Sequence, residues 1–215
     1  MLELYSFFRS SAAYRVRIAL ALKGLDFKLV PVNLIKHGGE QHLPDYRRLN
    51  PQGLVPTLVD DGLVLTQSLS ILEYLDEAYG PPALLPRTPQ ARARVRALAE
   101  QIACDIHPLN NLRVLRFFAR DMGVEKPMRD RWYTHWITLG FDALEASLQS
   151  PGTGLCCHGD EPGLADCCLV PQVFNARSYD MDLSAWPTIE RIDRHCNTLA
   201  AFQAAHPAAQ PDSAE

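Results

Sequence analysis

The chain has 215 residues, 47% of them hydrophobic and 21% charged, which is globular composition with room for one large domain or two small ones. A formal net charge of −4 and a pI near 6.0 argue against a nucleic-acid-binding surface. No apolar run reaches the length of a membrane span, and the N-terminus lacks a signal-peptide pattern. We therefore expect a soluble, cytoplasmic protein.

Residues 1–80 alternate between strand and helix patterns. A strand is predicted near Leu2–Ser6, a helix near Ser11–Lys23, and a second strand over Phe27–Val32, where valine, leucine and phenylalanine concentrate. Gly24 stands where glycine commonly ends a helix. The three elements form a βαβ unit, so the two strands should be parallel with a right-handed crossover.

The polar segment 37–42 predicts a loop, with a short irregular helix after it. The runs Thr57–Val59 and Leu63–Leu65 flank an Asp-Gly turn and predict a β-hairpin. A helix follows over about Leu69–Tyr79, and its inward residues are Ile71, Leu72 and Leu75. The order in this half of the chain is therefore βαβ, an irregular segment, then ββα.

Pro56 stands just before the first strand of that hairpin, where its missing N–H is tolerated. A cis Val55–Pro56 bond would turn the Val55 N–H and C=O outward, toward the backbone of a ligand. Since only about 5–6% of such bonds are cis in folded proteins, an ordinary trans proline is the default expectation.

The second half of the chain reads as helical after a proline-rich break. We predict a domain over 1–80, a linker over 81–89, an all-helical domain over 90–205 and a flexible tail over 206–215. Four helices are expected, over about 89–118, over 127–148, from Gly163 onward, and over 188–204. The first should bend at Pro108. The apolar side of the second carries Trp132, Trp136, Leu139 and Leu144. Asp166 is placed to bond back to the N-cap amide of the third.

Ser10 and Ser11 lie where the first strand hands over to the first helix. The unpaired N–H groups and the positive dipole end of a helix favour an anion there, and a serine hydroxyl could hydrogen-bond a thiolate or a phosphate. The structural alternative is that a serine only caps the helix.

The six cysteines do not form a disulfide or metal pattern. In a chain of this length, reduced and mostly buried thiols are the expectation. Cys156-Cys157-His158 and Cys167-Cys168 lack the ligand spacing of zinc sites, so we expect no metal.

Five segments of the chain carry a more specific pattern. They are YSFFRSSAAYRVRIAL (residues 5–20), LNPQGLVPTL (49–58), QSLSILEYL (67–75), ADCCLVPQV (165–173) and QPD (210–212). Together they resemble the zeta class of the glutathione transferase family, which contains maleylacetoacetate and maleylpyruvate isomerases. The sequence departs from the class pattern at Ala12, Tyr14 and Gly163, where cysteine, tryptophan and a serine or threonine cap are usual.

The resemblance implies the fold class α/β plus all-α, with a thioredoxin-like βαβ-ββα N-terminal domain followed by a helical-bundle C-terminal domain. It implies glutathione as cofactor and a homodimer. The implied reaction is cis–trans isomerisation of a small maleyl keto-dicarboxylate in aromatic catabolism, either maleylacetoacetate or maleylpyruvate. Alternatives that stay open are a transferase that conjugates or dehalogenates small electrophiles, and a non-catalytic ligand-binding protein of the same fold. A disulfide oxidoreductase is disfavoured because the first turn has no cysteine.

The resemblance also assigns roles to single residues of the N-terminal domain. Ser10 would hydrogen-bond the glutathione thiol, with Ser11 as a second donor. Val55 would pair its backbone with the cysteinyl unit. Gln67 and Ser68 would bind the γ-glutamyl carboxylate, Ser68 from a helix N-terminus where negative charge is favoured. The structural alternative for Ser68 is a helix cap, and one residue can serve both roles.

The remaining predicted contacts come from both halves of the chain. Gln41 would reach the glycyl end of glutathione, and the further cofactor contacts are Arg15, His107 and Asn111. His107 and Asn111 lie four residues apart on one helix face, although a solvated histidine before proline is the competing interpretation. The implied substrate is a dicarboxylate, and arginine side chains bind carboxylates through charge-assisted hydrogen bonds. The candidate arginines are Arg9, Arg113 and Arg177. For each arginine the alternative is a surface ion pair.

Overall fold

The computed structural model describes residues 1–214, without the side chains of His37 and Ala214. Over this range the chain divides into two compact units, one of residues 1–84 with the segment from Asn197 onward, the other Leu85–Cys196. The boundary after Leu84 lies inside the segment 81–89. Among the described residues, no helix combines the length and apolarity needed to cross a membrane.

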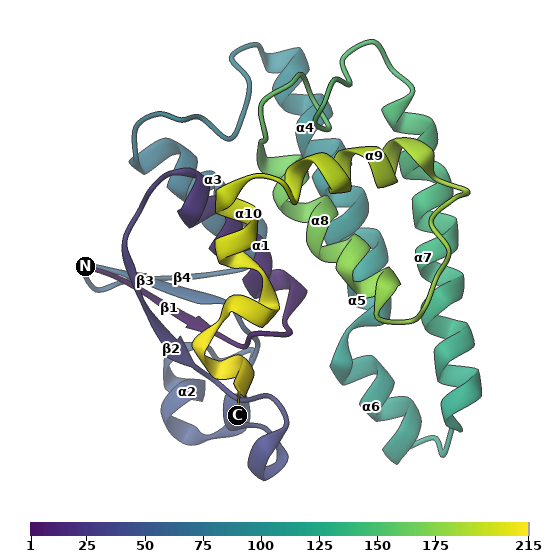
Figure 1. Cartoon of the computed structure of the whole chain (residues 1–215). Helices are drawn as coiled ribbons and strands as arrows, with labels where there is room; N and C mark the ends of the chain where they lie inside the picture. Colours follow the sequence, from purple (N-terminus) through teal and green to yellow (C-terminus); the bar gives the residue numbers. More distant parts are fainter. Residues whose placement is uncertain (215) are drawn as a thin grey trace. The chain divides into compact units, whose positions relative to one another are not determined.

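The first unit is built on a mixed sheet, which has four strands in the described part of the chain, in the order β2-β1-β3-β4. Its elements are β1 (Leu2–Ser6), α1 (Ser11–Leu22), β2 (Phe27–Pro31), two short 3-10 helices (Lys36–Gly38 and Glu40–His42), α2 (Pro44–Leu49), β3 (Thr57–Asp60), β4 (Leu63–Thr66), α3 (Ser68–Ala78) and α10 (Ala200–Ala205) (Figure 1). β1 pairs parallel with β2 and antiparallel with β3, and β3 and β4 form a hairpin. The predicted βαβ-ββα order is thereby confirmed.

Helix α1 is the buried centre of this unit. It packs against α3 and α10, and every residue from Ala13 to Leu20 is buried (Figure 1). Its C-terminus closes as the sequence predicts. Gly24 has φ of +62°, its N–H bonds to Ala21 O, and the N–H of Leu25 bonds to Leu20 O. This Schellman motif needs a left-handed residue, which glycine adopts without steric cost.

The C-terminal segment differs from the prediction of a flexible tail over 206–215. After α10, residues 207–209 and 211–214 form short 3-10 helices, and the side chains of Gln210 and Asp212 are buried. Phe202 and Ala205 are buried where α10 packs on α1. The apolar face of α10 therefore keeps this segment with the first unit instead of with the helical one.

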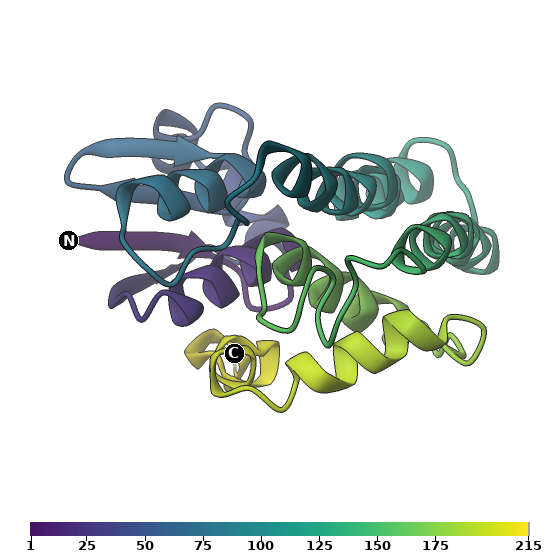
Figure 2. The same ribbon diagram turned by 90° about the horizontal axis from the view of Figure 1, so that it is seen from above.

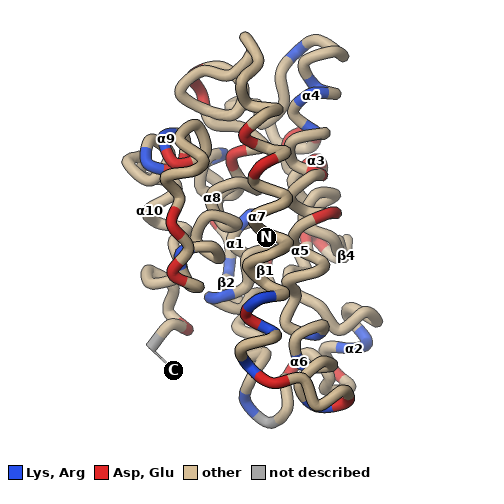
Figure 3. The backbone as a smooth tube through the Cα atoms, turned by 90° about the vertical axis from the view of Figure 1, so that its right-hand side faces the viewer, with Lys and Arg blue, Asp and Glu red and all other residues tan. Residues whose placement is uncertain are grey.

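The second unit consists of helices. They are α4 (Pro89–Glu100), a π-helix (Gln101–Ile106), α5 (His107–Asn110), α6 (Leu112–Arg120), α7 (Lys126–Leu148), α8 (Leu164–Arg177) and α9 (Pro187–Cys196). Helix α8 is buried along almost its whole length and packs against α4 and α9. Seen from above, α9 runs alongside α8 (Figure 2). Both signs of charge are interleaved along α9 (Figure 3).

The single helix predicted over 89–118 is interrupted at two places. Pro108 has no N–H, and its ring conflicts with the carbonyl four residues earlier. The helix accommodates Pro108 through a π-turn that precedes the proline, in which the N–H of His107 bonds to Ile102 O. The break itself comes three residues after the proline, where Asn111 is extended and its side chain caps α6.

Two further predictions about helices are corrected. Leu139, expected on the apolar side of α7, is 49% exposed, because the buried stripe runs instead through Tyr133, Ile137, Phe141, Leu144 and Leu148. The helix expected over 188–204 ends at Cys196, and α10 starts at Ala200 after an extended Leu199.

Asp166 secures the start of α8 as the sequence predicts. Its Oδ2 accepts the N–H of Gly163 at 2.9 Å, and its Oδ1 accepts the N–H of Cys157 at 2.8 Å. Burial raises the pKa of this carboxyl, while both backbone donors oppose that rise. One carboxylate thus satisfies a helix N-terminus and the loop before it.

Replacing this carboxylate should destabilise the fold. We expect Asp166→Ala to lower the free energy of unfolding by roughly 2–4 kcal/mol, because it removes a cap and leaves the buried Cys157 N–H and the half-buried Gly163 N–H without this acceptor. Asp182→Ala is the matched control, since Asp182 also accepts a backbone N–H, from Ser184, but is exposed. Urea titrations of both variants measure the difference, and equal losses would contradict the assignment.

Candidate active site

The turn between β1 and α1 places Ser10 at the N-cap of α1. Its N–H bonds to Phe7 O at 2.9 Å, and its Oγ accepts the N–H of Ala13 at 3.3 Å. Ser10 is half-buried, Ser11 is buried and Arg9 is exposed. A hydroxyl that accepts a backbone N–H keeps its own proton to donate. The two interpretations of Ser10 are therefore compatible, because it caps the helix and can still donate to an anion at the helix N-terminus.

The start of α3 brings three predicted residues close together. The side chain of Arg15 is buried in α1, and its Nη1 donates to Ser68 Oγ at 3.1 Å. Gln67, just before Ser68, has a φ of +68°, and its Nε2 donates to Gln52 Oε1 at 2.7 Å. A non-glycine residue with positive φ is strained, and such strain concentrates at functional sites.

Val55 lies at the end of the loop that leads into β3. The Val55–Pro56 peptide bond is cis, the less common of the two isomers considered from the sequence. The neighbouring Leu54 carbonyl accepts two hydrogen bonds, one from Tyr46 Oη at 2.6 Å and one from Asn50 Nδ2 at 2.8 Å. These contacts fix the backbone that precedes Val55.

Gln41 is buried in the 3-10 helix Glu40–His42. Its Nε2 lies 3.1 Å from His42 Nε2, and its Oε1 has no hydrogen-bond partner among the described residues. Gly39 permits this packing, since a Cβ there would stand 2.5 Å from Gln41 Nε2. A buried acceptor without a partner is costly, so it points to a group that binds there.

His107, Asn111 and Arg113 meet at the helix break of the second unit. Asn111 Nδ2 lies 3.3 Å from His107 Nε2, as the four-residue spacing predicts, and its Oδ1 accepts the N–H of Arg113 at 3.0 Å. The Arg113 side chain is exposed in the first turn of α6. The Asn111 amide therefore contacts the His107 ring and caps α6 through the backbone of Arg113.

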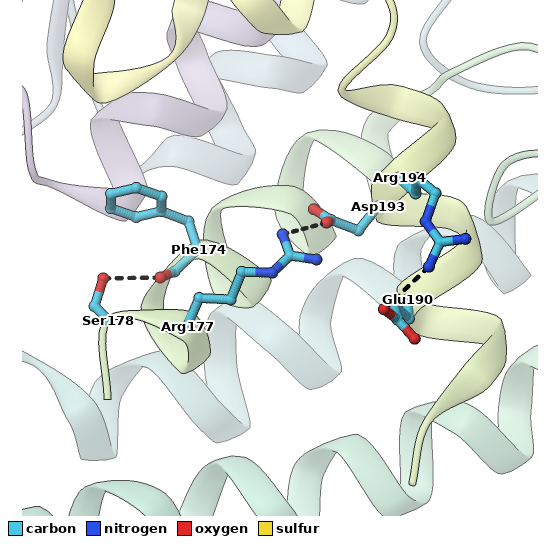
Figure 4. A network of polar contacts seen from close by, with 6 residues as sticks. All are labelled: Phe174, Arg177, Ser178, Glu190, Asp193 and Arg194. Atoms are coloured by element: carbon cyan, nitrogen blue, oxygen red, sulfur yellow. Dashed lines mark hydrogen bonds and ion pairs between the residues drawn. The ribbon is translucent and has the colours of Figure 1, made fainter. Parts of the chain in front are cut away.

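Arg177 ends α8 in an ion pair. Its Nη1 lies 2.5 Å from Asp193 Oδ2 on α9, and beside it Arg194 pairs with Glu190 (Figure 4). The Asp193 side chain is 2% exposed, whereas that of Arg177 is 47% exposed. This geometry gives Arg177 a structural partner that the sequence did not identify.

The cysteines are all free thiols, buried except for Cys104. Ligand atoms of Cys156, Asp166 and Cys196 lie within 4.8 Å of one another and could in principle hold a metal. Burial raises the pKa of Cys157 and of Cys167. Because the Asp166 oxygens already accept two backbone N–H groups, this group acts first as the cap of α8.

Sequence reasoning missed two residues next to the Ser10 turn. Arg17 lies six residues beyond Ser11 in α1 and is buried, and Asp212 lies in the C-terminal segment. Both bond to the turn that carries Ser10. The signal was present as an arginine inside an otherwise apolar helical run, and as an aspartate in the family-like QPD tail.

Comparisons with known proteins identify the family to which this chain belongs. Residues 4–83 match the family model for the glutathione S-transferase N-terminal domain. A probable maleylacetoacetate isomerase of Vibrio cholerae is 49% identical over 212 residues, covering 99% of this chain and 98% of that protein. A holo structure of a bacterial zeta-class maleylpyruvate isomerase superposes with a TM-score of 0.94 at 47% identity, covering 98% and 99% of the two chains.

A maleylacetoacetate isomerase from Anaeromyxobacter dehalogenans is also similar, with a TM-score of 0.86, 43% identity and coverage of 99% and 97%. Its crystal structure holds dicarboxyethyl glutathione and citrate in the active site. The chain therefore belongs to the glutathione S-transferase family, and within it to the zeta class, with the maleylacetoacetate and maleylpyruvate isomerases as its relatives.

Proposed function

We propose that this protein is a glutathione-dependent cis–trans isomerase of a maleyl keto-dicarboxylate, either maleylacetoacetate or maleylpyruvate. The proposal rests on the hydrogen bonding of Ser10. Its hydroxyl oxygen accepts the Ala13 N–H and caps α1, so the hydroxyl proton can still be donated to a thiolate at the helix N-terminus. Relatives that are about half identical over almost the whole chain bear names of this activity. The five buried thiols fit a reducing compartment, which supports a cytoplasmic enzyme.

The residues of the first unit fit glutathione. Ser68 at the start of α3, supported by buried Arg15, would receive the γ-glutamyl carboxylate together with Gln67. The unpartnered Gln41 Oε1 would accept an N–H near the glycyl end. Val55 would offer its backbone to the cysteinyl unit, and Ser11 a second donor beside Ser10. From the second unit, His107 and Asn111 would supply further contacts.

When bound, glutathione supplies a thiolate that adds reversibly to the cis double bond, so that this bond becomes single and can rotate before the thiolate leaves and the trans isomer is released. The Ser10 hydroxyl donates to that sulfur, and the N-terminal dipole of α1 stabilises its negative charge. A thiol has a pKa near 8.5, and each unit by which that value falls corresponds to about 1.36 kcal/mol. When the thiolate adds, negative charge develops on the carbonyl oxygen of the substrate. The candidates to bind that oxygen and the substrate carboxylates are the guanidinium groups of Arg9, Arg113 and Arg177.

Removing the Ser10 hydroxyl tests the thiolate partner. Ser10→Ala should raise the pKa of the bound glutathione thiol and lower turnover by roughly one to two orders of magnitude, since one activating hydrogen bond is lost. Ser11→Ala should have the smaller effect. The measurement is thiolate absorbance against pH, together with steady-state rates.

A capping control separates this chemistry from helix stability. Thr88 caps α4 with the same geometry, its Oγ1 accepting Ala91 N–H at 3.3 Å, so Thr88→Ala removes a cap without touching the Ser10 turn. It should leave the thiol pKa unchanged. If Ser10→Ala also leaves that pKa unchanged, Ser10 is only a cap.

Arg177 distinguishes an isomerase of dicarboxylates from a general transferase. Arg177→Ala should raise KM for the maleyl substrate about tenfold or more, the effect of losing one charge-assisted hydrogen bond, while KM for glutathione and conjugation of a neutral aryl halide change little. Asp193→Asn breaks the ion pair but keeps the guanidinium, so it should preserve most substrate affinity.

Two outcomes would overturn parts of this assignment. If Arg177→Ala lowers the isomerisation and conjugation rates equally, Arg177 serves only to pair with Asp193. If the wild-type protein conjugates neutral electrophiles but isomerises neither maleyl substrate, it is a general transferase.

We also propose that the protein is a homodimer, with α3 and the first part of α4 at the interface. The outer strand β4, which contacts α3, exposes Leu63 and Val64, apolar residues that a second copy could cover. Light scattering at micromolar concentration should give twice the chain mass of 24.0 kDa. A monomer mass under those conditions contradicts the proposal.

A further inference from the structure

The guanidinium of Arg17 joins three parts of the first unit. Arg17 is 1% exposed within α1. Its Nη2 donates to Phe8 O at 3.0 Å, its Nη1 to Ser6 Oγ at 3.1 Å, and its Nε to Ala205 O at 3.0 Å. One side chain therefore ties the end of β1 and the following turn to the last residue of α10.

Asp212 holds the same turn from the other side. Its Oδ2 accepts the Phe8 N–H at 2.9 Å, a contact between residues 204 positions apart. The carboxylate is 5% exposed, and its charge favours the guanidinium of Arg17, whose pKa burial lowers to about 10. Burying two charged groups is costly, so their presence beside one short turn needs a reason beyond packing.

The C-terminal segment is braced so that it can hold the turn. Gln210 Nε2 donates to Ala204 O at 2.9 Å and to His206 O at 3.0 Å. His206 Nδ1 accepts the Ala208 N–H at 3.1 Å, and its ring meets Tyr14 edge-on with centroids 6.1 Å apart. These bonds fix the path from α10 to Asp212.

As a result, both backbone polar groups of Phe8 are held, its C=O by Arg17 and its N–H by Asp212. Phe8 stands two residues before Ser10, whose own N–H bonds to Phe7 O. The orientation of the Ser10 hydroxyl and of the first N–H groups of α1 thus depends on this pair.

We propose that Arg17 and Asp212 are positioning residues for the turn of residues 7–10, which carries Ser10. Through Asp212, the C-terminal segment thereby contributes to the glutathione site. The proposal rests on the proposed function, in which Ser10 meets the glutathione thiol. Neither residue touches the thiol in this account. They act by fixing the backbone of residues 7–10, which sets the direction of the Ser10 hydroxyl. That direction matters because the strength of a hydrogen bond to a thiolate depends on the orientation of its donor.

Variants of Asp212 test this role. Asp212→Ala should raise the pKa of the bound glutathione thiol by about 0.5–1 and lower kcat about tenfold, leaving KM for the maleyl substrate within about twofold. Hydrogen exchange of the peptide that spans residues 6–12 should accelerate. Asp212→Asn retains an oxygen that can accept the Phe8 N–H, so it should restore most of both values.

Ser213→Ala is the matched control from the same 3-10 helix, because among the described residues Ser213 Oγ bonds within the segment, to Ala208 O at 3.4 Å. It should leave exchange and thiol pKa as in wild type. The proposal is overturned if Asp212→Ala loosens the turn without moving the thiol pKa, or if exchange over residues 6–12 stays at the wild-type rate.

These readouts also separate this proposal from the proposed function, because neither thiol pKa nor exchange requires isomerisation. If wild type lowers the thiol pKa but isomerises no maleyl substrate, only the proposed reaction fails. If wild type does not lower the thiol pKa at all, there is no thiolate for the turn to stabilise, and the positioning role fails as well.

Discussion

Burial of helix α1 is the constraint on which the first unit depends. The helix packs against α3 and α10, and its residues from Ala13 to Leu20 are buried, two arginines among them. A buried guanidinium must find acceptors, since its desolvation is otherwise uncompensated. Arg15 finds Ser68 at the start of α3, and Arg17 finds the carbonyls of Phe8 and Ala205. The packing of one helix thereby organises two helix N-termini.

Those two helix N-termini are where the glutathione chemistry is proposed. Ser10 opens α1 and Ser68 opens α3, so the thiol end and the γ-glutamyl end of one ligand would each meet a positive helix dipole and a serine. The rest of the first unit serves these positions. Tyr46 and Asn50 hold the loop before Val55, and Gly39 makes room for the Gln41 side chain.

The sequence predicted most of this fold because its signals are local. Gly24 ends α1, Asp166 caps α8, and the Asp-Gly turn closes the β3–β4 hairpin, each within a few residues of its partner. What it missed depends on distant partners. The polar composition of the C-terminal residues predicts a mobile tail, whereas the Asp212 carboxylate accepts the N–H of Phe8, 204 positions away. The pairing of Arg177 with Asp193 likewise joins residues from two different helices, which no local pattern encodes. The break at Asn111 is local, since its side chain caps α6, but asparagine within a helical run is not by itself a sufficient signal for a break.

In the proposed reaction, glutathione acts as a catalyst and is regenerated. The most direct measurement is proton NMR of wild-type enzyme with maleylpyruvate or maleylacetoacetate and glutathione at about one-tenth of the substrate concentration, with an enzyme-free control. We expect complete conversion of at least one cis substrate to its trans isomer, faster than in the control, with the glutathione recovered as free thiol. Conversion that stops after one equivalent of glutathione with a thioether accumulating, or no conversion beyond the control, would contradict it.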